Sequence, residues 1–125
     1  HRQQLINRLE EHVSKHQSFL QKELNIADLA KQLGVPTHHL SLVLNQDMAQ
    51  RFSDYINLKR ITYMEERIRI DGLKKYTLET IALEAGFNTR ITFIRALRKL
   101  KGSNPKDYFR QVVKPNTGIS RKARR

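Results

Sequence analysis

The stretch LETIALEAGFNTRITFIRALRKLKGSNPKDY, residues 78–108, repeats the pattern of an earlier stretch, IADLAKQLGVPTHHLSLVLN, residues 26–45. Apolar and small residues match at an offset of 52 positions: Ile26 with Leu78, Leu29 with Ile81, Ala30 with Ala82, Leu33 with Ala85, Gly34 with Gly86 and Val35 with Phe87. After one inserted residue the match resumes at an offset of 53, with Leu40 and Phe93, Val43 and Ala96, and Leu44 and Leu97. Two copies in register are far more specific than either copy alone.

Each copy has the spacing of two helices joined by a tight turn. Apolar residues recur at i, i+3, i+4 and i+7, which predicts an amphipathic helix, and strand-like alternation is absent from the sequence. Gly34 and Gly86 follow these first helices, and a residue free to adopt positive φ often ends a helix. Ala30 and Ala82 are small where a second helix must cross closely. Short helix, glycine turn and second helix form the helix-turn-helix signature, here duplicated.

Further helices are predicted around the two copies. Leu5, Leu9 and Val13 recur every four residues and predict a leading helix. A run of about 18 residues that ends at Gly72 predicts a helix about 27 Å long. Its expected inward residues are Ile56, Ile61, Met64 and Ile68. The expected N-caps are Asn25 (with Asp28 in the first turn), Thr37, Ser53 and Asn88. Gly102 is expected to end the later helix, and Ser103-Asn104-Pro105 to start a short last helix buried through Tyr108 or Phe109.

These elements predict an all-α fold of about seven helices, in which two helix-turn-helix subdomains are joined by a long linker helix. The expected parts are a leading helix or linker from a missing upstream region (1–18), a first helix-turn-helix (19–52), the linker helix (53–72), a second helix-turn-helix with a short C-terminal helix (73–113) and a basic disordered tail (114–125). The chain begins at His1 without an initiator Met, and we interpret it as a fragment.

The charge of the chain indicates a polyanionic partner. The formal net charge is +12, and it is concentrated in the second half: residues 1–72 carry +1, residues 73–113 carry +6 and residues 114–125 carry +5. The absence of cysteine excludes disulfides, thiolate-bound zinc and cysteine nucleophiles. No apolar run is long enough to span a membrane and no signal peptide is visible, so we expect a cytoplasmic domain, with any membrane anchor lying upstream.

At these residues the sequence resembles the C-terminal DNA-binding domain of AraC/XylS-type transcription regulators. The resemblance covers about residues 19–110 and includes FSDYINLKRI, residues 52–61, between the two repeats. Its most specific part is Gly86-Phe87, the aromatic Phe93, the basic pair Arg98-Lys99 and then G-x-x-P-x-x-Y. The sequence departs from the family in the loop before Phe52, where Met48-Ala49-Gln50 replaces a frequent Thr-Gly, and at Leu97, where Phe is frequent.

The resemblance implies a double-stranded DNA partner, read by the second helix of each repeat. The implied base-reading positions are His38, Ser41 and Leu42 in the first unit and Arg90, Ile91, Ile94 and Arg95 in the second. Thr92 is a candidate for a base or a phosphate. The expected phosphate contacts are Thr37, Asn45, Arg98, Lys99, Lys101 and Lys106. Either arginine could instead contact phosphate or solvent, and Ile91 and Ile94 would be core residues if the helix were rotated.

Other functions have less support in the sequence. His12 and His16 have a metal-compatible spacing but no evident third ligand, and no catalytic triad, phosphate loop or dinucleotide motif is present, so we expect no enzyme, metal or cofactor. Three hypotheses remain: a sequence-specific transcription regulator, a non-specific architectural nucleic-acid binder, and a helical protein-interaction module. The first also implies the transcription machinery and an upstream sensor or dimerisation region of the same chain as partners.

Overall fold

The computed structural model describes residues 2–73 and 76–113, and all regular structure in these two ranges is helical. The elements are α1 (Arg2–His16), the 3-10 turn η1 (Ser18–Leu20), α2 (Ile26–Leu33), α3 (Thr37–Leu42), the π-helical turn η2 (Val43–Asp47), α4 (Phe52–Asp71), α5 (Leu78–Glu84), α6 (Arg90–Lys101) and α7 (Pro105–Val113). The seven α-helices and the order of the elements confirm the predicted all-α double helix-turn-helix architecture. The expected basic tail, residues 114–125, lies outside the described residues.

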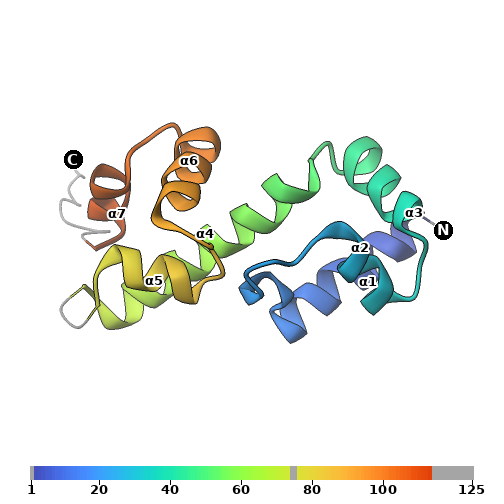
Figure 1. Cartoon of the computed structure of the whole chain (residues 1–125), viewed down its shortest axis with the longest axis horizontal. Coiled ribbons are helices and arrows are strands. Elements are labelled where there is room, and N and C mark those ends of the chain that lie inside the picture. Colours follow the sequence, from blue (N-terminus) through green and yellow to red (C-terminus); the bar gives the residue numbers. More distant parts are fainter. Residues whose placement is uncertain (1, 74–75, 114–125) are drawn as a thin grey trace, which may run out of the picture.

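The helix α4 joins two helical units and contributes to the core of both (Figure 1). It has 20 residues and is therefore about 30 Å long, slightly longer than the sequence predicts. Tyr55 and Ile56 pack into the first core with α1, η1, α2 and α3. Ile61, Met64 and Ile68 pack into the second core with α5, α6 and α7. Tyr63 packs against both cores, so the two units meet at the middle of this helix.

Several helix ends form as the sequence predicts. The Asn25 side chain accepts a hydrogen bond from the Asp28 backbone N–H, and the Asp28 carboxylate accepts one from the Asn25 N–H, which completes a capping box. The Asn104 side chain caps α7, which begins at Pro105. Phe109, one of the two residues expected to bury this last helix, is fully buried. Leu9 and Val13 of α1 are buried in the first core, so the leading helix packs against the first unit.

Two predicted N-caps in the first half are wrong. Thr37 is the first residue of α3, and the preceding Pro36, held at φ −63°, occupies the cap position without a side-chain bond. Ser53 lies inside the first turn of α4, whose cap position is taken by Arg51. The helix starts earlier because Phe52 packs against the first core, and this tertiary contact outweighs the local preference for a serine cap.

The predicted cap at Asn88 is also wrong, because α6 begins one residue later with Thr89 as its cap. The Thr89 hydroxyl accepts from the Thr92 N–H, and the Thr92 hydroxyl accepts from the Thr89 N–H. A cap at Asn88 would have Ile91 in the reciprocal position, and isoleucine cannot return a hydrogen bond. The capping box therefore selects Thr89.

We expect Thr89→Ala to lower the free energy of unfolding by about 1 kcal/mol, the usual cost of losing a helix cap. Asn88→Ala is the matched control and is expected to have a much smaller effect, because Asn88 is exposed and is not the cap of α6. Urea unfolding of both variants checks this. Equal destabilisation by the two substitutions would contradict the assignment of the cap.

The first repeat ends differently from the second, which the sequence did not predict. After Leu42 the helix widens into the π-helical turn η2, and Ala49 then adopts a positive φ of 53°. In the second repeat α6 continues for 12 residues and ends at Gly102 in the left-handed conformation. The second helix of the first repeat is thus short and widened, whereas that of the second repeat is a regular α-helix of about three turns.

Among the described residues, no helix is both long enough and apolar enough to cross a membrane.

Candidate nucleic-acid interface

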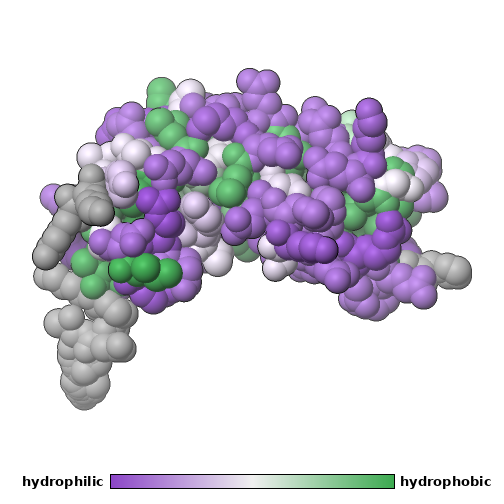
Figure 2. All heavy atoms as spheres, turned by 90° about the horizontal axis from the view of Figure 1, so that it is seen from below, coloured by the Kyte–Doolittle hydropathy of each residue, from purple (hydrophilic) through white to green (hydrophobic). Residues whose placement is uncertain are grey.

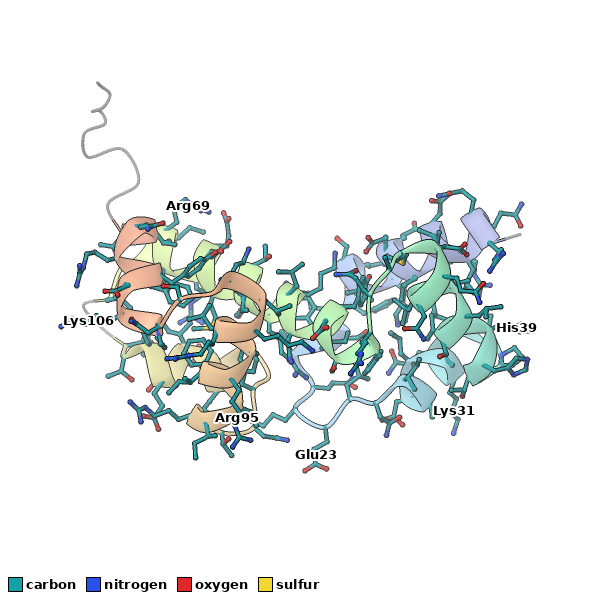
Figure 3. All side chains as sticks on the ribbon, turned by 90° about the horizontal axis from the view of Figure 1, so that it is seen from above. Glu23, Lys31, His39, Arg69, Arg95 and Lys106 are labelled. Atoms are coloured by element: carbon teal, nitrogen blue, oxygen red, sulfur yellow. The ribbon has the colours of Figure 1, made fainter. Side chains whose placement is uncertain are left out.

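The second helices of the two repeats lie on the same side of the molecule. In Figure 1, α6 and the α3–η2 segment both lie along the upper side, at opposite ends of α4. Figure 3 looks onto this side and shows α6 and the α3–η2 segment toward opposite ends of the linker helix. The opposite side, seen in Figure 2, is largely hydrophilic, with apolar residues scattered among polar ones. Two helices on opposite sides of the molecule could not contact the same DNA duplex. Because α3 and α6 lie on the same side, the fold allows both to contact one duplex.

In the second unit, α6 exposes its N-terminal half. Arg90, Ile91 and Arg95 are exposed, and Ile91 retains 59 % of its accessible surface although it is apolar. Ile94 is half-buried and packs against the second core, so it only partly faces solvent. The helix is therefore rotated so that Ile91 is available to a ligand, whereas Ile94 is shared between the surface and the core. The Arg90 guanidinium lies 4.0 Å from the Glu79 carboxylate, at the limit of an ion pair.

Thr92 is exposed, but its hydroxyl already has partners. It accepts from the Thr89 N–H at 3.1 Å and donates to the Thr89 carbonyl oxygen at 2.8 Å. Both bonds hold the first turn of α6 together. Thr92 thus fixes the orientation in which its neighbours Arg90, Ile91 and Arg95 are presented.

In the first unit, Thr37, His38, Leu42 and Asn45 are exposed, and Ser41 is half-buried. The Asn45 amide donates to the Ser41 hydroxyl at 3.2 Å, across one turn of the helix. The His38 and His39 rings lie edge to face, with their centroids 4.5 Å apart. Leu42 retains 44 % of its surface. This surface carries no arginine among its proposed base-reading residues, in contrast to α6.

Comparison with known proteins identifies the family. A family model described as a helix-turn-helix domain matches residues 29–111, about two thirds of the chain. The chain belongs to the AraC-type helix-turn-helix family. It is a DNA-binding domain of the transcription-regulator class.

Solved structures share the AraC-type fold at low sequence identity. The C-terminal domain of AraT, a response regulator from Geobacillus stearothermophilus, has a TM-score of 0.69 and 24 % identity, covering 85 % of this chain and 84 % of that one. The C-terminal domain of the two-component response regulator yesN from Fusobacterium nucleatum has a TM-score of 0.66 and 22 % identity, covering 84 % and 97 %. A Listeria innocua protein of unknown function has a TM-score of 0.68 and 23 % identity, covering 84 % and 94 %. No curated protein sequence matches the chain significantly.

The four basic residues expected to contact phosphate all lie on the second unit of this AraC-type domain. Arg98, Lys99, Lys101 and Lys106 are all exposed. Lys99 forms an ion pair of 3.0 Å with Asp54 on the first turn of α4. The Lys101 ammonium lies over the Tyr108 ring, 5.8 Å from its centroid. These contacts leave the ammonium groups at the surface, where they can also approach a phosphate.

His12 and His16 lie side by side on α1 of the AraC-type domain, and His12 also contacts α2. Their rings lie 4.6 Å apart, and His12 Nε2 is 2.8 Å from the Gln32 side-chain oxygen, a hydrogen bond that joins α1 to α2. Within residues 2–73 and 76–113, no group of three potential metal ligands comes together.

Two basic residues that the sequence reasoning missed connect the two units of the domain. Arg60 is 8 % exposed, and burial lowers the pKa of its guanidinium to about 10, so it remains charged at neutral pH. Lys22 Nζ donates to main-chain oxygens of the second unit. The sequence did hold a signal for Arg60: it lies four residues from both Ile56 and Met64, on the face predicted to be buried.

Proposed function

We propose that this domain binds double-stranded DNA sequence-specifically, with α3 and α6 in adjacent major grooves. The observation that carries the proposal is the pair of second helices, both with exposed polar N-terminal halves, on one side of a linker about 30 Å long. A helix fits the major groove, and successive major grooves on one face of the duplex are about 34–36 Å apart. A linker of this length, with its flanking turns, can span that separation.

The second unit supplies most of the sequence discrimination in this proposal. Arg90 and Arg95 can each form a bidentate pair with a guanine edge, and one such pair discriminates against the wrong base by about 1–3 kcal/mol. Exposed Ile91 suits the methyl group of thymine, and half-buried Ile94 can add a smaller apolar contact at the same edge. Thr92 contributes by holding the first turn, and any contact it makes with DNA is additional.

The first unit reads DNA more weakly in this proposal. Leu42 can contact a thymine methyl group, while His38 and Ser41 can form single hydrogen bonds with base edges or phosphates. Thr37 and Asn45 lie beside them and are proposed to contact phosphates. Each of the two helices is proposed to contact one half of the DNA site, called a half-site. The half-site under α3 should therefore tolerate more base changes than the half-site under α6.

Phosphate contacts are proposed to supply most of the affinity, through Arg98, Lys99, Lys101 and Lys106. The concentration of positive charge after residue 72 makes the second unit the stronger anchor. If the two helices do not match straight DNA, the duplex must bend, and the cost of bending depends on its sequence.

We also propose that the chain is the output domain of a longer regulator. The support is that two structural neighbours are C-terminal domains of response regulators. An upstream sensor or dimerisation region would then control DNA binding, and the bound domain would act on the transcription machinery.

The test of base reading is Arg95→Ala, with Arg69→Ala as the matched control. Both arginines are exposed and lie at opposite edges of the molecule in Figure 3. Duplexes selected from a random pool define the preferred site, and binding is then measured on that site and on single-base variants. We expect Arg95→Ala to reduce discrimination at one base pair about tenfold, within the range for one bidentate contact. We expect Arg69→Ala to leave discrimination unchanged.

Three results would count against the proposal, each in a different way. Equal loss on all duplexes for Arg95→Ala removes this residue from the base readers. Selection without a consensus favours the non-specific architectural binder, for which the net charge of +12 is the supporting observation. No binding at low salt favours a helical protein-interaction module.

A further inference from the structure

The two units touch each other at a buried arginine near the midpoint of α4. Arg60 Nε donates to the Phe19 carbonyl oxygen at 2.6 Å, and Arg60 Nη2 donates to the Gln21 carbonyl oxygen at 2.8 Å. Both acceptors belong to the first unit. The third donor, Nη1, bonds to the Asn57 side chain at 3.0 Å, one turn earlier on α4. A buried charge is costly unless its donors are satisfied, so these bonds fix the guanidinium in one place.

The other side of the guanidinium contacts the second unit. Its central carbon lies 5.6 Å from the centroid of the Phe87 ring, in cation–π geometry. Gly86 packs at the same point, because a Cβ atom there would overlap the Phe19 carbonyl oxygen and lie 2.7 Å from Arg60 Nε. The turn of the second repeat is thus pressed against η1 of the first unit with Arg60 in contact with both.

Lys22 also contacts the turn between α5 and α6. Its ammonium donates to the Leu83 carbonyl oxygen at 2.5 Å and lies 3.4 Å from the Phe87 carbonyl oxygen. These oxygens lie at and just beyond the end of α5, where a cation is stabilised by the helix dipole. The contact joins the loop after η1 to the turn that precedes α6. Both Lys22 contacts are with main-chain oxygens, whose positions are fixed by the fold.

We propose that Arg60 is a positioning residue that fixes the separation and orientation of α3 relative to α6. This inference rests on the proposed function, since it concerns how two DNA-reading helices are aligned. In this proposal α4 alone does not determine the spacing of the two half-sites. The Arg60 guanidinium and the Lys22 contact also prevent the two units from rotating relative to each other about the middle of α4. The domain then binds as one body and selects one half-site spacing.

The direct test measures the distance between the units without DNA. The sequence contains no cysteine, so Glu11→Cys on α1 and Gln111→Cys on α7, both exposed, give unique sites for spin labels. Pulsed electron resonance reports the distance distribution between them. We expect a narrow distribution for the parent protein and a broadened or shifted one for Arg60→Met, which retains a long side chain but loses all the donors.

The functional test uses the duplex selected for the parent protein, with base pairs inserted or deleted between its half-sites. We expect Arg60→Met to reduce the affinity ratio between the selected spacing and a spacing changed by two base pairs about tenfold, because independent units lose the gain of a rigid connection. Arg69→Met is the matched control, since it removes an exposed charge from the same helix. If Arg60→Met does not fold, Lys22→Met, at an exposed position, is expected to show a smaller change of the same kind.

The outcomes separate this inference from the proposed function. If the parent protein shows no preferred spacing or no two half-sites, the proposed function fails. If the parent has a sharp spacing preference and both Arg60→Met and Lys22→Met keep it, with an unchanged distance distribution, the positioning role is overturned. If Arg60→Met lowers the melting temperature but leaves the spacing preference unchanged, Arg60 only stabilises the fold. If Arg60→Met and Arg69→Met change the spacing preference equally, the positioning role is overturned as well.

Discussion

Replacing Gly86 with alanine is expected to destabilise the fold by about 4 kcal/mol, the sum of a strained backbone and an overpacked contact. Gly86 has φ +114°, which side-chain-bearing residues rarely adopt. The added methyl group would also overlap the Phe19 carbonyl oxygen. This oxygen accepts a hydrogen bond from the Arg60 guanidinium, so it cannot move away without breaking that bond. Urea unfolding, followed by circular dichroism, measures the change in the free energy of unfolding.

Gly34→Ala is the matched control for this prediction, because Gly34 is the equivalent residue of the first repeat. Its φ is +72°, and a Cβ atom there would meet nothing within 4 Å. We expect a cost of about 1 kcal/mol, the usual price of a left-handed alanine. If both substitutions lower the free energy of unfolding by the same amount, backbone strain alone explains the loss. The packing of Gly86 between the units then contributes nothing to stability.

The affinity for DNA is expected to fall about a hundredfold between 50 and 200 mM salt, as it does for proteins that neutralise about four phosphates. Thr37 and Asn45 of the first unit carry no charge, so the contacts that release counterions are those of the four basic residues from Arg98 to Lys106. Salt acts on them because each neutralised phosphate releases counterions when the protein binds. Titration of a labelled duplex at several salt concentrations gives the slope of log affinity against log salt.

Single substitutions assign this slope to residues. Arg98→Gln and Lys106→Gln are each expected to reduce its magnitude by about 0.9 and to weaken specific and scrambled duplexes alike. Arg69→Gln removes a charge from an exposed position on α4 and is expected to leave the slope unchanged. A slope that none of the basic residues of α6 and α7 affects would place the phosphate contacts elsewhere.

The sequence predicted the features that depend on neighbouring residues. Helical spacing and the repeated pattern gave the all-α double architecture, and the Asn25 capping box needed only Asn25 and Asp28 in register. The predicted cap at Ser53 failed because packing of Phe52 extends α4 backwards, a tertiary effect. The cap at Asn88 failed although the deciding residues, Thr89 and Thr92, lie in the local sequence, so closer attention to the reciprocal bond would have found it.

The candidate site was predictable to the extent that it depends on which side of a helix faces solvent. Arg90, Ile91 and Arg95 are exposed as expected, while Ile94 is shared with the core. The connection between the units was not predictable, because Arg60 and Lys22 bond to main-chain oxygens. Every residue has such an oxygen, so the sequence holds no sign of which one, 39 or 41 positions away, a guanidinium will reach.

Under the proposed function, the capping box of α6 determines which positions can be varied to change the DNA specificity of this domain. Thr92 is committed to the first turn, whereas the side chains of Ile91 and Arg95 project from the same turns without supporting the core. A combinatorial library that varies positions 90, 91 and 95 and keeps both threonines would therefore explore new operators on an unaltered scaffold. Randomising position 92 as well would confound altered recognition with a frayed helix.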